Sequence, residues 1–163
     1  LQDPFERLTL SDAFSRYAPM SLTEAIDNTC FGEIYSQHIE PNLGLQRPTF
    51  ITHYPSEMAA LARLCPEDPD QAERFELYIA GMELANAFSE LNDPVEQRQR
   101  FVAEQALREQ MGKAPSPLPE QFLQELEHLP PSAGIALGID RLAMLLTDSA
   151  TIDEVVAFTP EML

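Results

Sequence analysis

The stretch that decides the fold runs from Gly134 to Arg141 and reads Gly-Ile-Ala-Leu-Gly-Ile-Asp-Arg. The apolar residues 142–146, Leu-Ala-Met-Leu-Leu, follow it directly. This pattern predicts a strand over 133–137 and a helix over 139–146. Because the stretch is rich in small residues and ends in Asp-Arg at the start of an apolar helix, it would let the backbone and one arginine approach a bound nucleotide.

A second informative segment, residues 74–93, lies upstream of this stretch. Residues 73–79 and 82–88 read as two strands on either side of the pair Ala80-Gly81. Such a pair between two strand patterns is a hairpin signal. The segment therefore predicts a β-hairpin.

Three glutamates of this segment, Glu76, Glu83 and Glu90, are spaced by seven residues. In a hairpin with a two-residue loop, Glu76 and Glu83 are direct or diagonal neighbours on adjacent strands, and like charges this close repel each other unless a positive group lies between them. A magnesium ion that bridges triphosphate oxygens is one such group, because Mg²⁺ prefers hard oxygen ligands. The alternative is a solvated strand face on a very acidic protein.

Asn86 and Glu90 require a departure from regular strand geometry. Regular alternation would place both on the face opposite Glu83, so a bulge or a strand end near residues 85–89 is needed if all three line one pocket. A buried glutamate is costly without a partner, and the ammonium of a lysine-like substrate would supply one. The alternative is that Glu90 caps or flanks the helix that begins at Pro94.

Arg141 lies in the first turn of its predicted helix, where a cation gains nothing from the helix dipole. This position indicates a role outside the helix, because a guanidinium there is placed to stack on an adenine and to donate hydrogen bonds to phosphate oxygens. The alternative is a surface ion pair between Asp140 and Arg141.

The remaining chain reads as further helices and one more strand. Asp93, Pro94 and Glu96 form a strong helix start, with Asp93 as the N-cap, Pro94 at the first helical position and Glu96 at N3 as in a capping box. This helix should run to about Met111, with Gly112 as its C′ residue. The other predicted elements are helices over 8–17, 22–27, 32–39, 57–63 and 120–128, a strand over 48–54 and a polar loop over 65–70. The mixture predicts an α+β fold with an antiparallel sheet flanked by helices.

Composition limits the classes of function. The 163 residues are enough for a single domain, 1–163, with a hydrophobic core. The net charge of −17 predicts poor binding of nucleic acid, because such binding rests on cations placed against phosphates. No apolar run approaches the about 20 residues that a membrane span needs. The only two cysteines, Cys30 and Cys65, are expected to be reduced thiols of a cytoplasmic protein.

The Gly134–Arg141 stretch resembles motif 3 of class II aminoacyl-tRNA synthetases, and residues 74–93 resemble a segment of the lysine branch of that class. Other segments occur in the order found in that family: Glu40-Pro41, Pro48-Thr49-Phe50, Tyr54-Pro55 and Val155-Val156-Ala157-Phe158. Within the family, the chain looks most like the GenX branch (also called PoxA or EpmA), whose members attach a lysine-type amino acid to elongation factor P instead of to tRNA.

Substitutions at the matched positions favour the GenX branch. Ala136 stands where the tRNA synthetases usually have glycine, and Leu84-Ala85-Asn86 replaces their usual Ile-Gly-Asn. The two extra methyl groups would reshape an amino-acid pocket enough for about 1–3 kcal/mol of discrimination. Against this, residues 89–93 are closer to the tRNA synthetase version, and Ala87 departs from the glycine expected in both branches.

The resemblance implies a role for each matched residue. The magnesium ligands would be Glu76 and Glu83. ATP would contact Glu83, Leu84, Gly138 and Arg141, with Arg141 as the catalytic residue. The lysine-type amino acid would be held by Asn86, Glu90 and Ala136, with Glu90 binding the side-chain amine.

The resemblance also implies an activity. The protein would be a ligase that uses ATP and Mg²⁺ to form an aminoacyl-adenylate of a lysine-type amino acid and then transfers the acyl group to a lysine of elongation factor P. One alternative is lysyl-tRNA synthetase, with tRNA as acceptor, and another is a non-catalytic paralogue that binds a nucleotide or a protein. We find no match to motif 1, which builds the dimer interface, or to motif 2. The chain therefore reads as the C-terminal half of the catalytic domain of a homodimeric parent, and it is expected to be inactive alone.

Overall fold

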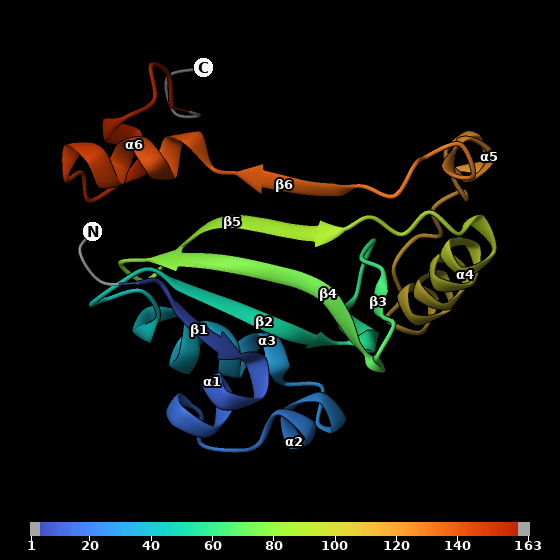
Figure 1. Ribbon diagram of the computed structural model, residues 1–163, viewed down its shortest axis with the longest axis horizontal. Coiled ribbons are helices and arrows are strands. Elements are labelled where there is room, and N and C mark those ends of the chain that lie inside the picture. Colours follow the sequence, from blue (N-terminus) through green and yellow to red (C-terminus); the bar gives the residue numbers. More distant parts are fainter. Residues whose placement is uncertain (1–3, 160–163) are drawn as a thin grey trace. The chain divides into compact units, whose positions relative to one another are not determined.

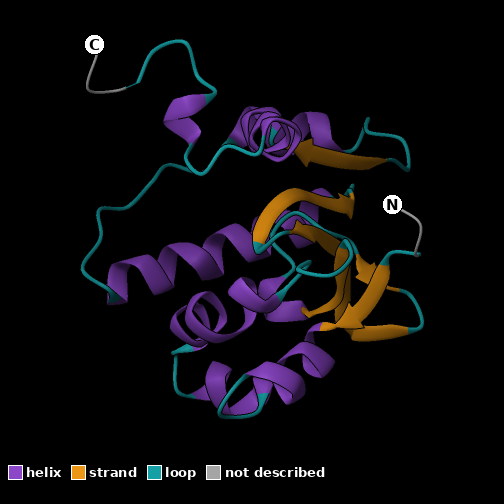
Figure 2. Ribbon diagram, turned by 90° about the vertical axis from the view of Figure 1, so that its left-hand side faces the viewer, coloured by secondary structure: helices purple, strands orange, loops and turns teal. Residues whose placement is uncertain are grey.

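The computed structural model describes residues 4–159. Helices and strands both make up large parts of the chain (Figures 1 and 2), so the α+β prediction is confirmed. The chain forms two compact units, the first of residues 1–53, 75–87 and 135–163 and the second of residues 54–74 and 88–134. A single domain over 1–163 stays a prediction.

The strands of the sheet follow the order β1 (Glu6–Thr9), β2 (Thr49–Pro55), β4 (Asp68–Ile79), β5 (Met82–Ser89) and β6 (Ala133–Leu137). β1 pairs in parallel with β2, so the sheet is mixed rather than antiparallel throughout. The helix predicted over 8–17 was wrong at its start, because Leu8 and Thr9 pair with β2. The helix begins only at Leu10, where the hydroxyl of Thr9 accepts a hydrogen bond of 3.0 Å from the backbone N–H of Asp12.

Three short helices of the first unit, α1 (Leu10–Tyr17), α2 (Leu22–Asp27) and α3 (Phe31–Ile34), lie on the same side of β1 and β2 in Figure 1. α3 continues as a π-helix, Tyr35–Ile39, and a 3-10 helix, Glu40–Asn42. The predicted helix over 22–27 is confirmed. The one predicted over 32–39 is confirmed as a helix whose type changes at residue 35.

The core of the first unit lies between these helices and the strands. Its large, fully buried apolar side chains are Leu10, Phe14, Ile39, Leu43, Ile51 and Tyr78. Burying side chains of this size stabilises a fold by about 1.5–3 kcal/mol each. Phe31 stacks on both Phe14 and Tyr35, with ring centroids 5.4 and 5.3 Å away, and Tyr35 meets the ring edge of Tyr78 at 6.3 Å. This row of rings fixes the side chain of Tyr35 against β4.

The turn Ala80-Gly81 joins β4 to β5, which confirms the predicted hairpin. Both residues have positive φ, 53° and 74°, as a two-residue type I′ turn requires. The turn packs on residues 43–44, because the N–H of Ala80 donates to the carbonyl of Gly44 (2.9 Å) and that of Gly81 to the carbonyl of Leu43 (2.8 Å). A Cβ added to Gly44, whose φ is 70°, would lie 2.5 Å from the carbonyl oxygen of Tyr78. Only glycine fits there.

Gly44→Ala is expected to lower the free energy of unfolding by about 2–4 kcal/mol, because left-handed strain adds to a collision with backbone atoms. Gly112→Ala is the matched control. Gly112 has the same φ of 70°, but an added Cβ would have no neighbour within 4 Å. Its cost should stay near 1 kcal/mol. Urea unfolding followed by circular dichroism measures both, and equal losses would contradict the crowding argument.

The second unit contains a 3-10 helix (Ser56–Met58), β3 (Leu64–Cys65), α4 (Pro94–Gln110) and α5 (Glu120–Leu126). The helices predicted to begin at Pro94 and Glu120 are confirmed. The helix predicted over 57–63 was wrong, because only one 3-10 turn forms before Ala60 adopts a φ of 52°. The polar loop predicted over 65–70 was also wrong. Leu64 pairs with Ala72 and Cys65 with Asp68, so β4 begins at Asp68 after a tight turn.

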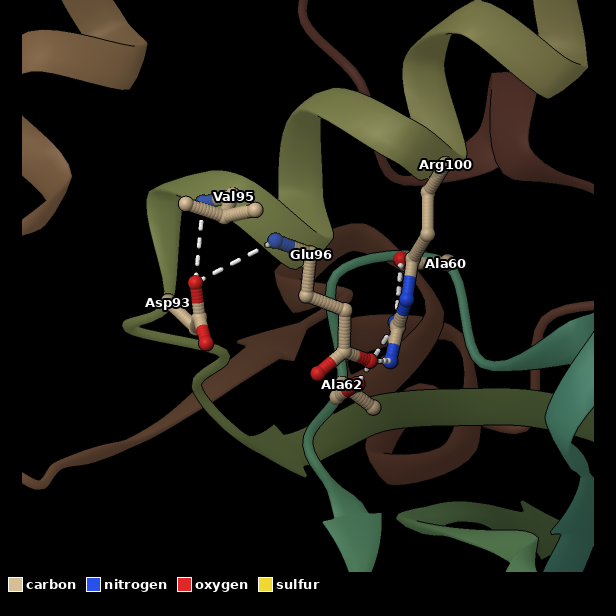
Figure 3. A network of polar contacts seen from close by, with 6 residues as sticks. All are labelled: Ala60, Ala62, Asp93, Val95, Glu96 and Arg100. Atoms are coloured by element: carbon tan, nitrogen blue, oxygen red, sulfur yellow. Dashed lines mark hydrogen bonds and ion pairs between the residues drawn. The ribbon is translucent and has the colours of Figure 1, made fainter.

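Figure 3 shows how α4 is anchored within the second unit. A carboxylate oxygen of Asp93 accepts hydrogen bonds from the N–H groups of Val95 (2.8 Å) and Glu96 (3.2 Å), which confirms Asp93 as the N-cap. The carboxylate of Glu96 pairs with Arg100 one turn later instead of closing a capping box. Arg100 also donates to the carbonyls of Ala60 (3.0 Å) and Ala62 (2.8 Å), which ties the helix to the loop before β3.

β6 leads into α6 (Ile139–Thr147), and a 3-10 turn (Ile152–Glu154) follows. The strand and the helix predicted from the opening stretch are therefore confirmed. Several large apolar side chains here are exposed, among them Ile135 (63%), Ile139 (64%), Leu146 (78%) and Phe158 (72%).

Within residues 4–159, no helix combines the length and the apolar character needed to cross a bilayer.

Candidate functional site

The four residues predicted to bind ATP come together in the first unit, where β5 meets the start of α6. The N–H of Gly138 donates to the carbonyl of Leu84 at 2.9 Å. Arg141 donates from Nη1 to the carbonyl of Glu83 at 2.5 Å, and the same nitrogen lies 3.9 Å from that residue's carboxylate. The side chain of Arg141 stays 49% exposed. Arg141 thus pairs with Glu83. The alternative interpretation had paired Arg141 with Asp140.

Glu76 lies at the centre of a buried chain of hydrogen bonds. The hydroxyl of Tyr35 donates to that of Tyr78 (3.1 Å), and the Tyr78 hydroxyl donates to Oε2 of Glu76 (2.7 Å). The other carboxylate oxygen, Oε1, accepts a hydrogen bond of 3.0 Å from the side-chain amide of Asn86. Glu76 is only 7% exposed, so these hydrogen bonds replace the water that a carboxylate would otherwise bind.

Asn86 therefore lies on the same face as Glu76, although regular pairing across the hairpin would separate them. The burial pattern of β5 explains how this is possible: Leu84 and Ala85 are buried one after the other, which interrupts the alternation expected of a strand. The interruption falls at the beginning of the region in which a bulge was predicted. The bulge itself stays a prediction.

The protonation of Tyr78 is fixed by its surroundings. Burial, together with the neighbouring hydroxyl of Tyr35 and the carboxylate of Glu76, raises the pKa of the Tyr78 hydroxyl well above its usual range. The group therefore stays neutral and remains a hydrogen-bond donor at any physiological pH.

The two predicted magnesium ligands differ in exposure: the carboxylate of Glu83 is accessible, and that of Glu76 is enclosed. Among the described residues 4–159, no group of three or more His, Cys, Asp or Glu side chains is placed to hold a metal ion. The side chain of Glu83 is 33% exposed and can offer its oxygens, whereas both oxygens of Glu76 already accept hydrogen bonds. Each oxygen of a carboxylate has two lone pairs, so an oxygen that accepts one hydrogen bond can also bind a metal ion. The residues fit an ion whose remaining ligands are phosphate oxygens and water, which is how Mg²⁺ usually binds.

Glu90 lies in the second unit, where its side chain reaches the backbone of Gly134. A Cβ added to Gly134 would lie 2.3 Å from Oε1 of Glu90. The N–H of Glu90 donates to the carbonyl of Ser132 at 2.9 Å, which holds the two segments together. The N-cap of α4 is Asp93, so the alternative role of Glu90 as a cap does not apply.

Two features of this region were not predicted from the sequence. Tyr78 follows Glu76 by two residues on one strand, which places both on one face, and this periodicity was an available signal. Gly134 was singled out for its small size, but its contact with Glu90 joins residues 44 positions apart and has no local signal. Ala136, predicted to line the amino-acid pocket, lies exposed on β6.

Known proteins are similar to this chain in sequence. Residues 1–162 match the family described as tRNA synthetases class II (D, K and N). An elongation factor P–(R)-β-lysine ligase of Haemophilus ducreyi is 49% identical over 129 residues, which cover 78% of this chain and 39% of that protein. The corresponding ligase of Edwardsiella ictaluri is 42% identical over 148 residues, 87% of this chain and 46% of that protein.

A second group of relatives carries another name. A lysine–tRNA ligase of Moorella thermoacetica is 41% identical over 180 residues, which cover 97% of this chain and 36% of that protein. The chain thus spans less than half the length of each of these three relatives. All three are ligases by name, but the names divide between two acceptors.

Proposed function

This chain belongs to the class II tRNA synthetases (D, K and N), and from that premise we propose an activity for the natural polypeptide in which these 163 residues occur. The polypeptide activates a lysine-type amino acid with ATP and transfers it to a lysine of elongation factor P. In the first step the amino-acid carboxylate attacks the α-phosphorus of ATP in line, which gives an aminoacyl-adenylate and pyrophosphate. In the second step the amine of the acceptor lysine attacks the acyl carbon and releases AMP. The protein contributes mainly positioning and charge stabilisation.

The observation that carries the proposal is the cluster formed by Glu83, Leu84, Gly138 and Arg141. Arg141 is held by Glu83 at one nitrogen, and its half-exposed guanidinium keeps further donors for phosphate oxygens and a flat face for an adenine. Magnesium, when bound, would supply positive charge to the triphosphate, with Glu83 and Glu76 as its protein ligands. Glu83 also holds Arg141 in place, through a hydrogen bond to its backbone carbonyl and an ion pair of 3.9 Å with its carboxylate, so one residue would position both positive charges.

Amino-acid recognition would rest on Asn86, Glu90 and Ala136. Glu90 is a carboxylate placed against a glycine, and it would pair with the side-chain ammonium of the substrate. The methyl group of Ala136, where a glycine is usual, would reshape the amino-acid pocket and help to separate lysine isomers.

The acceptor of the activated amino acid is proposed to be a protein and not tRNA. The net charge of −17 supports a protein acceptor over tRNA, because a nucleic-acid acceptor needs cations against its phosphates. A second candidate function is transfer to tRNA, which is supported by the lysine–tRNA ligases among the relatives. Residues that match motifs 1 and 2 would come from elsewhere in the natural polypeptide, which we propose to be a cytoplasmic homodimer. The 163 residues alone would be inactive.

ATP–pyrophosphate exchange by the natural polypeptide tests the first step, with L-lysine and (R)-β-lysine compared as substrates. Preference for the β-isomer is expected if the acceptor is elongation factor P. Preference for L-lysine would support the tRNA alternative, and exchange with neither isomer would overturn the proposed activity in favour of a non-catalytic binding protein. Transfer of the labelled amino acid to purified elongation factor P or to tRNA then identifies the acceptor directly.

A further inference from the structure

The hydrogen-bond chain from Tyr35 to Asn86 has a defined direction. Tyr35 donates to Tyr78, Tyr78 donates to Glu76, and Asn86 donates to the other oxygen of Glu76. A carboxylate only accepts hydrogen bonds, so the side of the Asn86 amide that faces Glu76 must be its NH₂ group. The orientation of the Asn86 side chain is therefore set by Glu76.

This orientation leaves the amide oxygen of Asn86 as an acceptor. Oδ1 of Asn86 is buried, and it accepts no hydrogen bond from any residue in the part of the chain that the structure describes. Buried polar atoms are almost always paired, because leaving one unpaired costs much of its desolvation energy. The atom that pairs with Oδ1 must be a donor, and an N–H of an amino-acid substrate has the right chemistry.

We propose that Tyr78 is a positioning residue: acting through Glu76, it fixes the amide of Asn86 so that Oδ1 accepts a hydrogen bond from an N–H group of the lysine-type substrate. This inference rests on the proposed function and adds a residue to which the resemblance assigned no role. The Tyr78 hydroxyl suits the task, because it is fully buried and is itself oriented by the hydroxyl of Tyr35. Without it, Oε2 of Glu76 loses the hydrogen bond from Tyr78, and the carboxylate is held less firmly against Asn86.

Tyr78→Phe in the natural polypeptide tests the inference. The variant keeps the ring and its packing but removes the hydrogen bond to Glu76. The KM for the amino acid in pyrophosphate exchange, and its Kd measured by calorimetry without ATP, should both rise about 5- to 20-fold. The KM for ATP should rise less than the KM for the amino acid, because Arg141 and Glu83 stay in place and only Glu76, the second proposed magnesium ligand, is loosened. Equal weakening of ATP and amino-acid binding, together with a lower Tm, would overturn a positioning role in favour of a structural one.

A double-mutant cycle shows whether Tyr78 acts through Asn86. In an Asn86→Ala background, Tyr78→Phe should no longer change amino-acid binding, since the group that it positions is gone. The same loss in both backgrounds would overturn the proposal. Tyr35→Phe is the matched control, because it removes a buried tyrosine hydroxyl one step further away, and its effect should stay near twofold.

These experiments distinguish a failure of the role proposed for Tyr78 from a failure of the proposed function. If the wild-type polypeptide binds and activates lysine but Tyr78→Phe leaves amino-acid binding unchanged, this inference fails and the proposed function stands. If the wild type binds neither lysine isomer, the proposed function fails and the inference fails with it.

Discussion

Arg141→Ala in the natural polypeptide should reduce ATP–pyrophosphate exchange by about 10²- to 10³-fold, the loss typical of removing one preorganised donor from a transition state. Arg141 is fixed by Glu83 at 2.5 Å before any ligand arrives, so its positive charge needs little reorganisation during the reaction. Glu83→Ala should have a comparable effect, because it removes the carboxylate beside Arg141 and one proposed magnesium ligand. Both rates are measured under saturating amino acid.

Arg98→Ala provides the matched control for the arginine. Arg98 also pairs with a glutamate, Glu120, but both side chains are about half exposed on the second unit, and surface pairs of this kind contribute little. Its exchange rate should equal that of the wild type within about twofold. If Arg141→Ala and Glu83→Ala both retain the wild-type rate, the site assignment is wrong.

Glu90→Gln should reduce kcat/KM for the lysine-type amino acid by about 10²- to 10³-fold, since it removes the negative charge that would face the substrate's ammonium. The amide has the same shape, so the free energy of unfolding should change little. Gly134→Ala tests the same carboxylate by adding a methyl group beside it. Its new methyl group would lie 2.3 Å from Oε1, so Glu90 must rotate away, and about tenfold weaker amino-acid binding is expected.

Glu109→Gln, an exposed position on α4, is the matched control for Glu90→Gln and should leave all constants unchanged. Selectivity for lysine over norleucine, whose side chain lacks the terminal ammonium, is a second readout, which should collapse in Glu90→Gln alone. If Glu90→Gln discriminates between the two as well as the wild type does, Glu90 does not bind the substrate ammonium.

Features with local sequence signals could be predicted. The N-cap of α4 depends on Asp93 and the two N–H groups that follow it, and the hairpin depends on a glycine at one turn position, so a few neighbouring residues determine each. The grouping of Glu83 with Arg141 was predicted only through the resemblance to a family, because 58 positions separate the two residues.

The missed features depend on partners that are distant in the sequence. β1 is only four residues long and pairs with residues more than 40 positions away, so its own sequence reads as the first turn of α1. The start of β4 contains Asp68 and Pro69, residue types that are depleted in strands, and only its pairing with β3 reveals it. The anchoring of Glu76 depends on Tyr35, which a π-helix brings to β4.

The exposed side chains of β6 bear on the colloidal behaviour of the protein. β6 ends the order of strands, and Ile135 and Leu137 on it are 63% and 44% exposed. A terminal strand with apolar side chains readily pairs with another copy of itself. At neutral pH the net charge of −17 keeps copies apart by repulsion, and protonation of the carboxylates in acid removes it. Light scattering should therefore rise steeply as the pH falls, and less steeply when Ile135 is replaced by lysine, which places a charge on the strand through which copies would associate.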